Sequence, residues 1–143
     1  FVGITQYGTW YNLTSTEPDA PFEAQDIGRY SLRDTSSGDA FSIEDVGTFA
    51  SVKRSGEPHD LIMLINPTSI LLSDDLLFLQ GFSAIYGLAG WRGALYAFDE
   101  TGAVIQVNLD DLSYRVIDDQ GIPWWGAGVS PVLYTLVDPE PTE

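Results

Sequence analysis

The stretch 85–131 alternates short apolar runs with turn residues, and this pattern constrains the fold more than any other feature of the chain. It opens with Tyr86-Gly87-Leu88-Ala89-Gly90-Trp91 and closes with a variant of that segment, Trp124-Trp125-Gly126-Ala127-Gly128. Between them, two apolar runs at 94–98 and 103–108 flank a turn at 99–102. Runs of five or six residues bounded by turns predict β-strands. A closing segment that repeats the opening one indicates the end of one repeat and the start of the next.

Three β-hairpins are expected along the chain, and they share a frame. The first has arms 29–33 and 40–44 around a turn at 34–38, and the second has arms 60–65 and 69–72 around Asn66–Thr68. The third is the hairpin 94–108. Leu61 and Leu95 open equivalent arms 34 residues apart. A period in this range, with about four short strands per unit, is typical of propeller blades.

The rest of the chain is also expected to be strands and loops. Strands are predicted at 1–11, 46–52, 76–79, 113–117 and 132–137, and a long loop at 12–26, where prolines and polar residues gather. A helix over 71–80 is the alternative after Leu72, because Ser73-Asp74-Asp75 could cap one. The acidic, proline-rich segment 138–143 is predicted to be a tail.

Composition excludes several classes of function. The formal net charge is −15, so phosphate repulsion disfavours nucleic acid and anionic membrane surfaces as partners. The chain has no cysteine, which excludes disulfides, thiolate zinc sites and iron–sulfur clusters. No apolar run approaches the roughly 20 residues that span a membrane. Because the sequence does not begin with Met, we expect a piece of a longer precursor.

The block from Tyr86-Gly87-Leu88 through Leu95-Tyr96-Ala97-Phe98 to Trp124-Trp125-Gly126-Ala127 resembles repeats in exported or lipid-anchored bacterial proteins of β-propeller type. The resemblance covers roughly residues 82–131. It implies blade-like repeats and a secreted or cell-surface location, and it carries over no catalytic residue.

We therefore expect one all-β domain over 1–137, built from propeller-like repeats of short antiparallel strands at about 27–55, 60–82 and 83–120. Residues 122–137 would start a further strand pair. A β-sandwich or an open barrel is the alternative, because a propeller closes with about four to eight blades. Three blades would need association with another copy, or a longer chain.

Catalytic motifs are sparse. No Gly-x-Ser-x-Gly segment is present, and a triad of Ser51 or Ser55 with His59 and Asp60 would need adjacent loop residues to adopt triad geometry. Paired carboxylates are common, but neighbours on a strand point to opposite faces, and turn formation explains them better than a glycosidase pair. Calcium, which prefers carboxylate oxygens, is a possible ligand at Asp110, Asp111, Asp118 and Asp119.

Aromatic and guanidinium side chains provide the candidate ligand-binding residues. An indole can cover the apolar face of a sugar ring while arginine or acidic groups bind its hydroxyls. The alternative is that the tryptophans pack between sheets, which we favour for Trp91 and Trp124. Trp125 points away from Trp124 if the segment is extended, so it is the better surface candidate. The candidate residues are Trp10, Trp91, Arg92 and Trp125.

The leading hypothesis for function is a non-enzymatic extracellular structural or interaction module. Its partners would be further copies of the chain or other bacterial surface proteins. A propeller-type lectin that binds glycans is the first alternative, and a glycoside hydrolase-like enzyme the second. No cofactor is expected apart from calcium.

Overall fold

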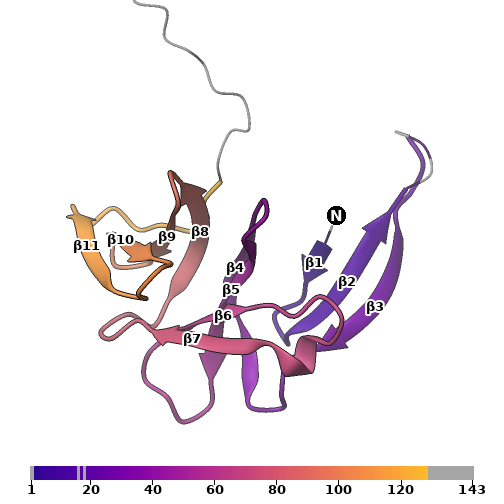
Figure 1. The fold of residues 1–143 in the computed structure, drawn as a ribbon, viewed down its shortest axis with the longest axis horizontal. Helices are drawn as coiled ribbons and strands as arrows, with labels where there is room; N and C mark the ends of the chain where they lie inside the picture. The colour runs from indigo at the N-terminus through magenta and orange to yellow at the C-terminus, as the bar shows by residue number, and fades with distance from the viewer. Residues whose placement is uncertain (1, 16, 18, 129–143) are drawn as a thin grey trace, which may run out of the picture.

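The computed structural model describes residues 2–15, 17 and 19–128. Within this part, eleven strands form three antiparallel sheets that lie side by side, and one short 3₁₀ helix lies outside the sheets (Figure 1). The all-β prediction is therefore confirmed, and none of the three sheets closes into a barrel. The described residues include no helix with the length and apolarity needed to span a membrane. The strand predicted at 132–137 and the tail 138–143 lie outside the described residues.

The first sheet contains β1 (Val2–Ile4), β2 (Thr9–Thr14) and β3 (Glu23–Arg29) in the order β1-β2-β3. The prediction of one strand over 1–11 is wrong, because a turn at 5–8 divides it. Gly8 takes a φ of 78° there, and its N–H donates to the Thr5 carbonyl at 2.9 Å. The loop predicted over 12–26 is also too long, since β2 continues to Thr14 and β3 begins at Glu23. Polar composition hid these strands because one side of the sheet is exposed.

The second sheet contains β4 (Asp34–Ile43), β5 (Gly47–Arg54), β6 (Leu61–Leu64) and β7 (Asp74–Phe78) as a meander. The hairpin predicted between 29–33 and 40–44 is wrong. The segment assigned to its turn begins β4, and β4 pairs with β5 across a bulge between Ser36 and Ala40. The arm predicted at 69–72 is also wrong, because Ile70–Leu72 forms the 3₁₀ helix η1. The helix considered for 71–80 is instead β7.

The third sheet is a second four-stranded meander, with β8 (Ile85–Trp91), β9 (Ala94–Asp99), β10 (Ala103–Asn108) and β11 (Tyr114–Asp119). The hairpin predicted at 94–108 and the strand predicted at 113–117 are confirmed. Leu61 lies in the third strand of its meander and Leu95 in the second strand of the next. Their 34-residue separation therefore does not relate equivalent strands. The third sheet lies within the range 83–120, whereas the strands of the second are shared between 27–55 and 60–82.

The second sheet is the centre of the molecule because it is buried on both faces. One cluster joins it to the first sheet and includes Trp10, Val52 and Leu61, and a second cluster joins it to the third sheet and includes Ile62 and Leu95. Neighbours on β6 thus enter different clusters, as the pleat of a strand requires. This explains the continuous apolar run at 61–65, since a strand covered on both sides has no polar face.

Candidate functional site

Strand β8 joins the second and third sheets and positions the residues around it. Two carboxylates, of Asp39 on β4 and of Asp60 just before β6, accept backbone N–H groups of β8. Asp60 Oδ2 accepts from Ile85 N, and Asp39 Oδ2 accepts from Leu88 N, both at 2.8 Å. Asp60 also accepts a hydrogen bond from the Ser37 hydroxyl. Burial raises the pKa of both aspartates, against the lowering effect of these hydrogen bonds.

Two glycines set the spacing on either side of β8. A Cβ added to Gly38 on β4 would lie 2.7 Å from Tyr86 Cα, so only glycine lets β4 and β8 approach this closely. A Cβ added to Gly87 on β8 would lie 2.7 Å from Ala127 N and from Gly126 C. The segment 124–128 thus approaches β8 as closely as β8 approaches β4.

Aromatic contacts hold the segment 124–128 on the third sheet. Trp125 stacks on Tyr86, with ring centroids 5.4 Å apart and an interplanar angle of 9°. Trp124 meets Phe98 edge-on at 5.5 Å, and its Nε1 donates to the Gly102 carbonyl at 3.1 Å. Trp124 therefore packs against the sheet, while Trp125 remains 71% exposed.

Trp91 and Arg92 lie at the opposite end of β8 from this segment. Trp91 is 45% exposed, so it is not the core residue that the sequence favoured. The Arg92 guanidinium lies over the Trp91 ring, 5.5 Å from its centroid. Tyr86 and Arg92 are six residues apart along an extended strand, which is about 20 Å. The structure therefore does not bring Trp125 together with Trp91 and Arg92.

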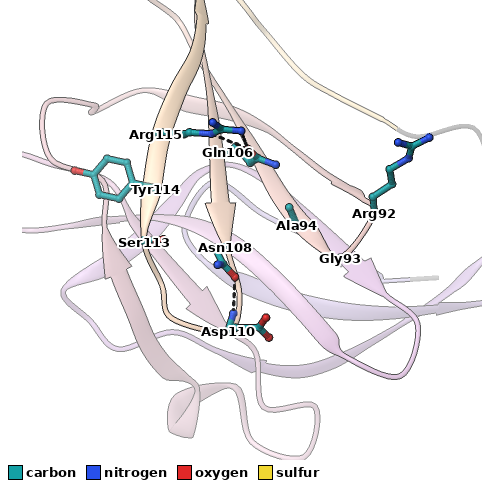
Figure 2. Close-up of a pocket in the computed structure, with 9 residues that line it drawn as sticks. All are labelled: Arg92, Gly93, Ala94, Gln106, Asn108, Asp110, Ser113, Tyr114 and Arg115. Carbon is teal, nitrogen blue, oxygen red and sulfur yellow. Dashed lines mark hydrogen bonds between the residues drawn. The ribbon is translucent and has the colours of Figure 1, made fainter.

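Arg92 borders an open pocket of about 610 Å³ on the outward side of the third sheet. Figure 2 shows Arg92 on one side of this pocket and Arg115 with Gln106 on the other. Arg115 Nε and Nη2 both donate to Gln106 Oε1, at 3.0 and 2.9 Å, and Gln106 Nε2 donates to the Tyr96 hydroxyl at 3.0 Å. We call this cavity the arginine pocket; its lining is Arg92, Gly93, Ala94, Gln106, Asn108, Asp110, Ser113, Tyr114 and Arg115.

Trp10 is placed in the core, away from the other three candidate ligand residues. It is 1% exposed and meets Tyr30 edge-on at 6.0 Å, between the first and second sheets. Trp10 therefore packs between sheets, which was the alternative to ligand binding considered for the tryptophans. An indole this deeply buried is not available to stack on a ligand.

The four candidate calcium ligands fall into two separate pairs. Asp110 and Asp111 lie in the turn before β11, and Asp118 and Asp119 at its far end, roughly 15–20 Å away. Asp111 Oδ1 accepts from Ser113 N at 2.9 Å and Ser113 Oγ at 2.7 Å, and these hydrogen bonds lower the pKa of its carboxyl. Across the described part of the chain, no three histidine, cysteine or acidic residues gather at one point as metal ligands would.

The catalytic triad considered for Ser51 or Ser55 with His59 and Asp60 is not formed in the structure. His59 Nδ1 accepts from Gly81 N at 3.0 Å, whereas Asp60 faces Ser37 and β8. Ser51 Oγ instead accepts from Asp39 N at 3.1 Å.

Sequence reasoning missed Arg115 and Gln106. They are directly opposed across β10 and β11, and this register is set by the length and conformation of the connection at 109–113 between the two strands. The signal that could have identified Arg115 is its rarity, since the chain has six Lys and Arg residues against 21 Asp and Glu. Asp60 was considered only for a triad, and its buried position became evident from the contact between sheets.

Comparisons of the chain with protein-family models, with curated proteins and with solved structures find no match.

Proposed function

We propose that the three sheets are consecutive blades of a propeller-type repeat and that the chain is a non-catalytic structural or interaction module at the bacterial cell surface. One observation carries the proposal. Gly38 lets β8 lie against β4, and Gly87 lets the segment 124–128 lie against β8 in the same way. Each close approach involves a glycine on the first strand of a four-stranded meander. This supports a repeat in which each first strand packs on the preceding one.

The outward side of the third sheet offers a surface on which copies of the chain could associate. The second sheet is covered on both faces, while the described residues that lie on the outward face of the third sheet belong to the segment 121–128. Propellers close with about four to eight blades, so three sheets leave a ring open. The exposed apolar side chains beside this face include Trp125 (71% exposed) and Ile122 (56% exposed). We propose a second copy of the chain as the partner that covers them.

Light scattering combined with sedimentation velocity tests this proposal on the 143-residue chain. We expect association that grows with protein concentration. We also expect it to grow with salt, because two copies of charge −15 repel and salt screens that repulsion. Trp125→Ser should weaken the association, and Trp91→Ser, at the other end of β8, should leave it unchanged. A monomer at every accessible concentration and salt level would exclude self-association.

Carbohydrate binding is the second candidate function. It is favoured by the exposed Trp91 ring, the Arg92 guanidinium over it and the polar arginine pocket beside them. No observation on the described residues favours the hydrolase alternative, and we do not propose it.

A further inference from the structure

The arginine pocket is lined by two arginines that form no ion pair within the described part of the chain. Among the described residues, Lys53 pairs with Asp60, and Arg54 pairs with Asp34 and Asp75. Arg92 and Arg115 form no ion pair with any described carboxylate, and both line the same pocket. Arg29 and Arg33 also form no ion pair with a described carboxylate, so what sets Arg92 and Arg115 apart is that both lie at one pocket.

Arg115 is held in a fixed orientation with free donors. Its Nε and one Nη2 hydrogen are bound by Gln106, which is itself fixed by the Tyr96 hydroxyl. Arginine has five N–H donors, so three remain for a ligand. A guanidinium that is already positioned loses less conformational entropy on binding an anion.

Arg92 occupies a backbone conformation that arginine rarely adopts. It and Gly93 form the two-residue turn between β8 and β9, with φ of 50° and 78°. Asn, Asp and Gly are the usual residues at such positions, and another L-residue costs about 1–2 kcal/mol in the left-handed region. The Arg92 side chain held in this unfavourable backbone conformation stacks on Trp91 and borders the pocket. Backbone strain of this kind is found at ligand sites.

The remainder of the pocket offers groups that bind hydroxyls. The Asn108 Oδ1 accepts from Asp110 N at 2.9 Å, which leaves its amide N–H groups available. In Figure 2 the Asp110 carboxylate lies on the far side of the pocket from Arg115, where it can accept from a hydroxyl. The volume of about 610 Å³ is in the range of small-ligand pockets, about 300–1,000 Å³.

The net charge of −15 does not prevent an anion from binding here. At physiological ionic strength, charges are screened over about 8 Å. The two guanidinium groups at the pocket therefore contribute more to its potential than carboxylates outside it, and Asp110 is the one acidic residue in the lining.

We infer that the arginine pocket binds an acidic saccharide, with the sugar carboxylate between Arg92 and Arg115 and the ring hydroxyls at Asn108 and Asp110. This inference deepens the carbohydrate-binding candidate and rests on it, and it is independent of self-association.

Isothermal titration calorimetry with trigalacturonic acid tests the inference, with maltotriose as the neutral trisaccharide and citrate as the carboxylate without a sugar ring. We expect trigalacturonic acid to bind at least about tenfold more tightly than maltotriose, since a charge-assisted contact is worth about 1.5–3 kcal/mol. We expect it to bind more tightly than citrate as well, because citrate has no ring hydroxyls for Asn108 and Asp110. Arg115→Gln and Arg92→Gln should each weaken binding by about tenfold or more. Arg29→Gln, which removes the same charge from the far sheet, should bind like the wild type. Quenching of tryptophan fluorescence on binding should be reduced in Trp91→Phe.

Four results would overturn the inference, and their consequences differ. Equal affinity for trigalacturonic acid and maltotriose would leave carbohydrate binding standing but exclude the acidic class. Equal affinity for citrate would show that the sugar ring is not recognised. If neither saccharide binds, or if both arginine variants bind like Arg29→Gln while retaining the wild-type unfolding temperature, the pocket is not a saccharide site.

Discussion

Replacing Gly87 by Ala tests whether the segment 124–128 packs on β8 as a first strand packs on its neighbour. The backbone at Gly87 does not have the positive φ that would itself exclude alanine. The added Cβ would lie 2.7 Å from Ala127 N and Gly126 C and 2.8 Å from Ala127 Cβ. Contacts under 3.0 Å with backbone atoms cannot be relieved by rotating a side chain. Either the sheet is strained or the segment moves away.

The expected loss in the free energy of unfolding is set by whichever response costs less, straining the sheet or displacing the segment 124–128. Overpacking costs about 1–3 kcal/mol. Moving the segment loses two aromatic pairs at about 0.5–1.5 kcal/mol each and one hydrogen bond of similar worth. That sum is about 1.5–4.5 kcal/mol, so we expect Gly87→Ala to cost about 1–3 kcal/mol. Because the two apolar clusters lie elsewhere, the aromatic contacts should be lost first.

Two measurements separate this local effect from general destabilisation. Urea unfolding gives the free energy, and acrylamide quenching with near-UV circular dichroism reports on Trp124 and Trp125. Gly126→Ala is the matched control, because a Cβ there would have no atom within 4 Å. The reasoning is refuted if Gly87→Ala and Gly126→Ala have the same midpoint and the same tryptophan quenching.

Two further predictions concern buried charges. Burial raises the pKa of Asp60, so the contribution of this carboxyl to stability is fully present at pH values below the pKa of a free aspartate and is lost as pH rises through the higher pKa of the folded state. Asp60→Asn should remove this loss. The free energy of unfolding of the variant should therefore improve relative to the wild type between pH 4 and neutral pH; parallel curves would contradict this. Arg54 donates to Asp34 at 2.7 Å and also binds Asp75. Burial raises the pKa of Asp34, but hydrogen bonds from Arg54 and Ser31 lower it by more, so the net effect is a lowered pKa. Arg54→Met leaves the Asp34 carboxylate buried without its partner, at a cost of about 3–5 kcal/mol, whereas Asp75→Asn at the half-exposed end should cost about 0–1 kcal/mol. Equal midpoints for the two variants in urea would show that burial at Asp34 does not decide the energetics.

The hairpin at 94–108 could be predicted because its signals are local. Both arms are short apolar runs, and the turn between them contains Gly102, which has a φ of 103°. The first predicted hairpin failed where the signals conflict. Ser36, Ser37 and Gly38 resemble turn residues, yet they continue β4, because Gly38 faces β8 and Ser37 binds the buried Asp60. A contact between distant strands thus overrides the local preference.

In the candidate site too, some features follow from local signals and others from contacts between distant parts of the chain. Trp125 could be identified as the exposed member of its pair because alternation along an extended segment is a local property. Trp10 and Trp91 were not separable in this way. One is covered by the second sheet and the other lies beside a turn on an outward face, and both stand next to polar or aromatic neighbours in the sequence.

Local sequence patterns were enough to predict that the chain is all-β and that its strands are short. These properties depend on the side-chain period of a strand and on turn residues, which act over a few positions. The folded structure was needed to learn which strands share a sheet, that the run at 61–65 is covered on both faces, and that Arg115 lies beside Gln106 across from Arg92. These depend on strand register and on the packing of one sheet against the next, which join residues far apart in the chain.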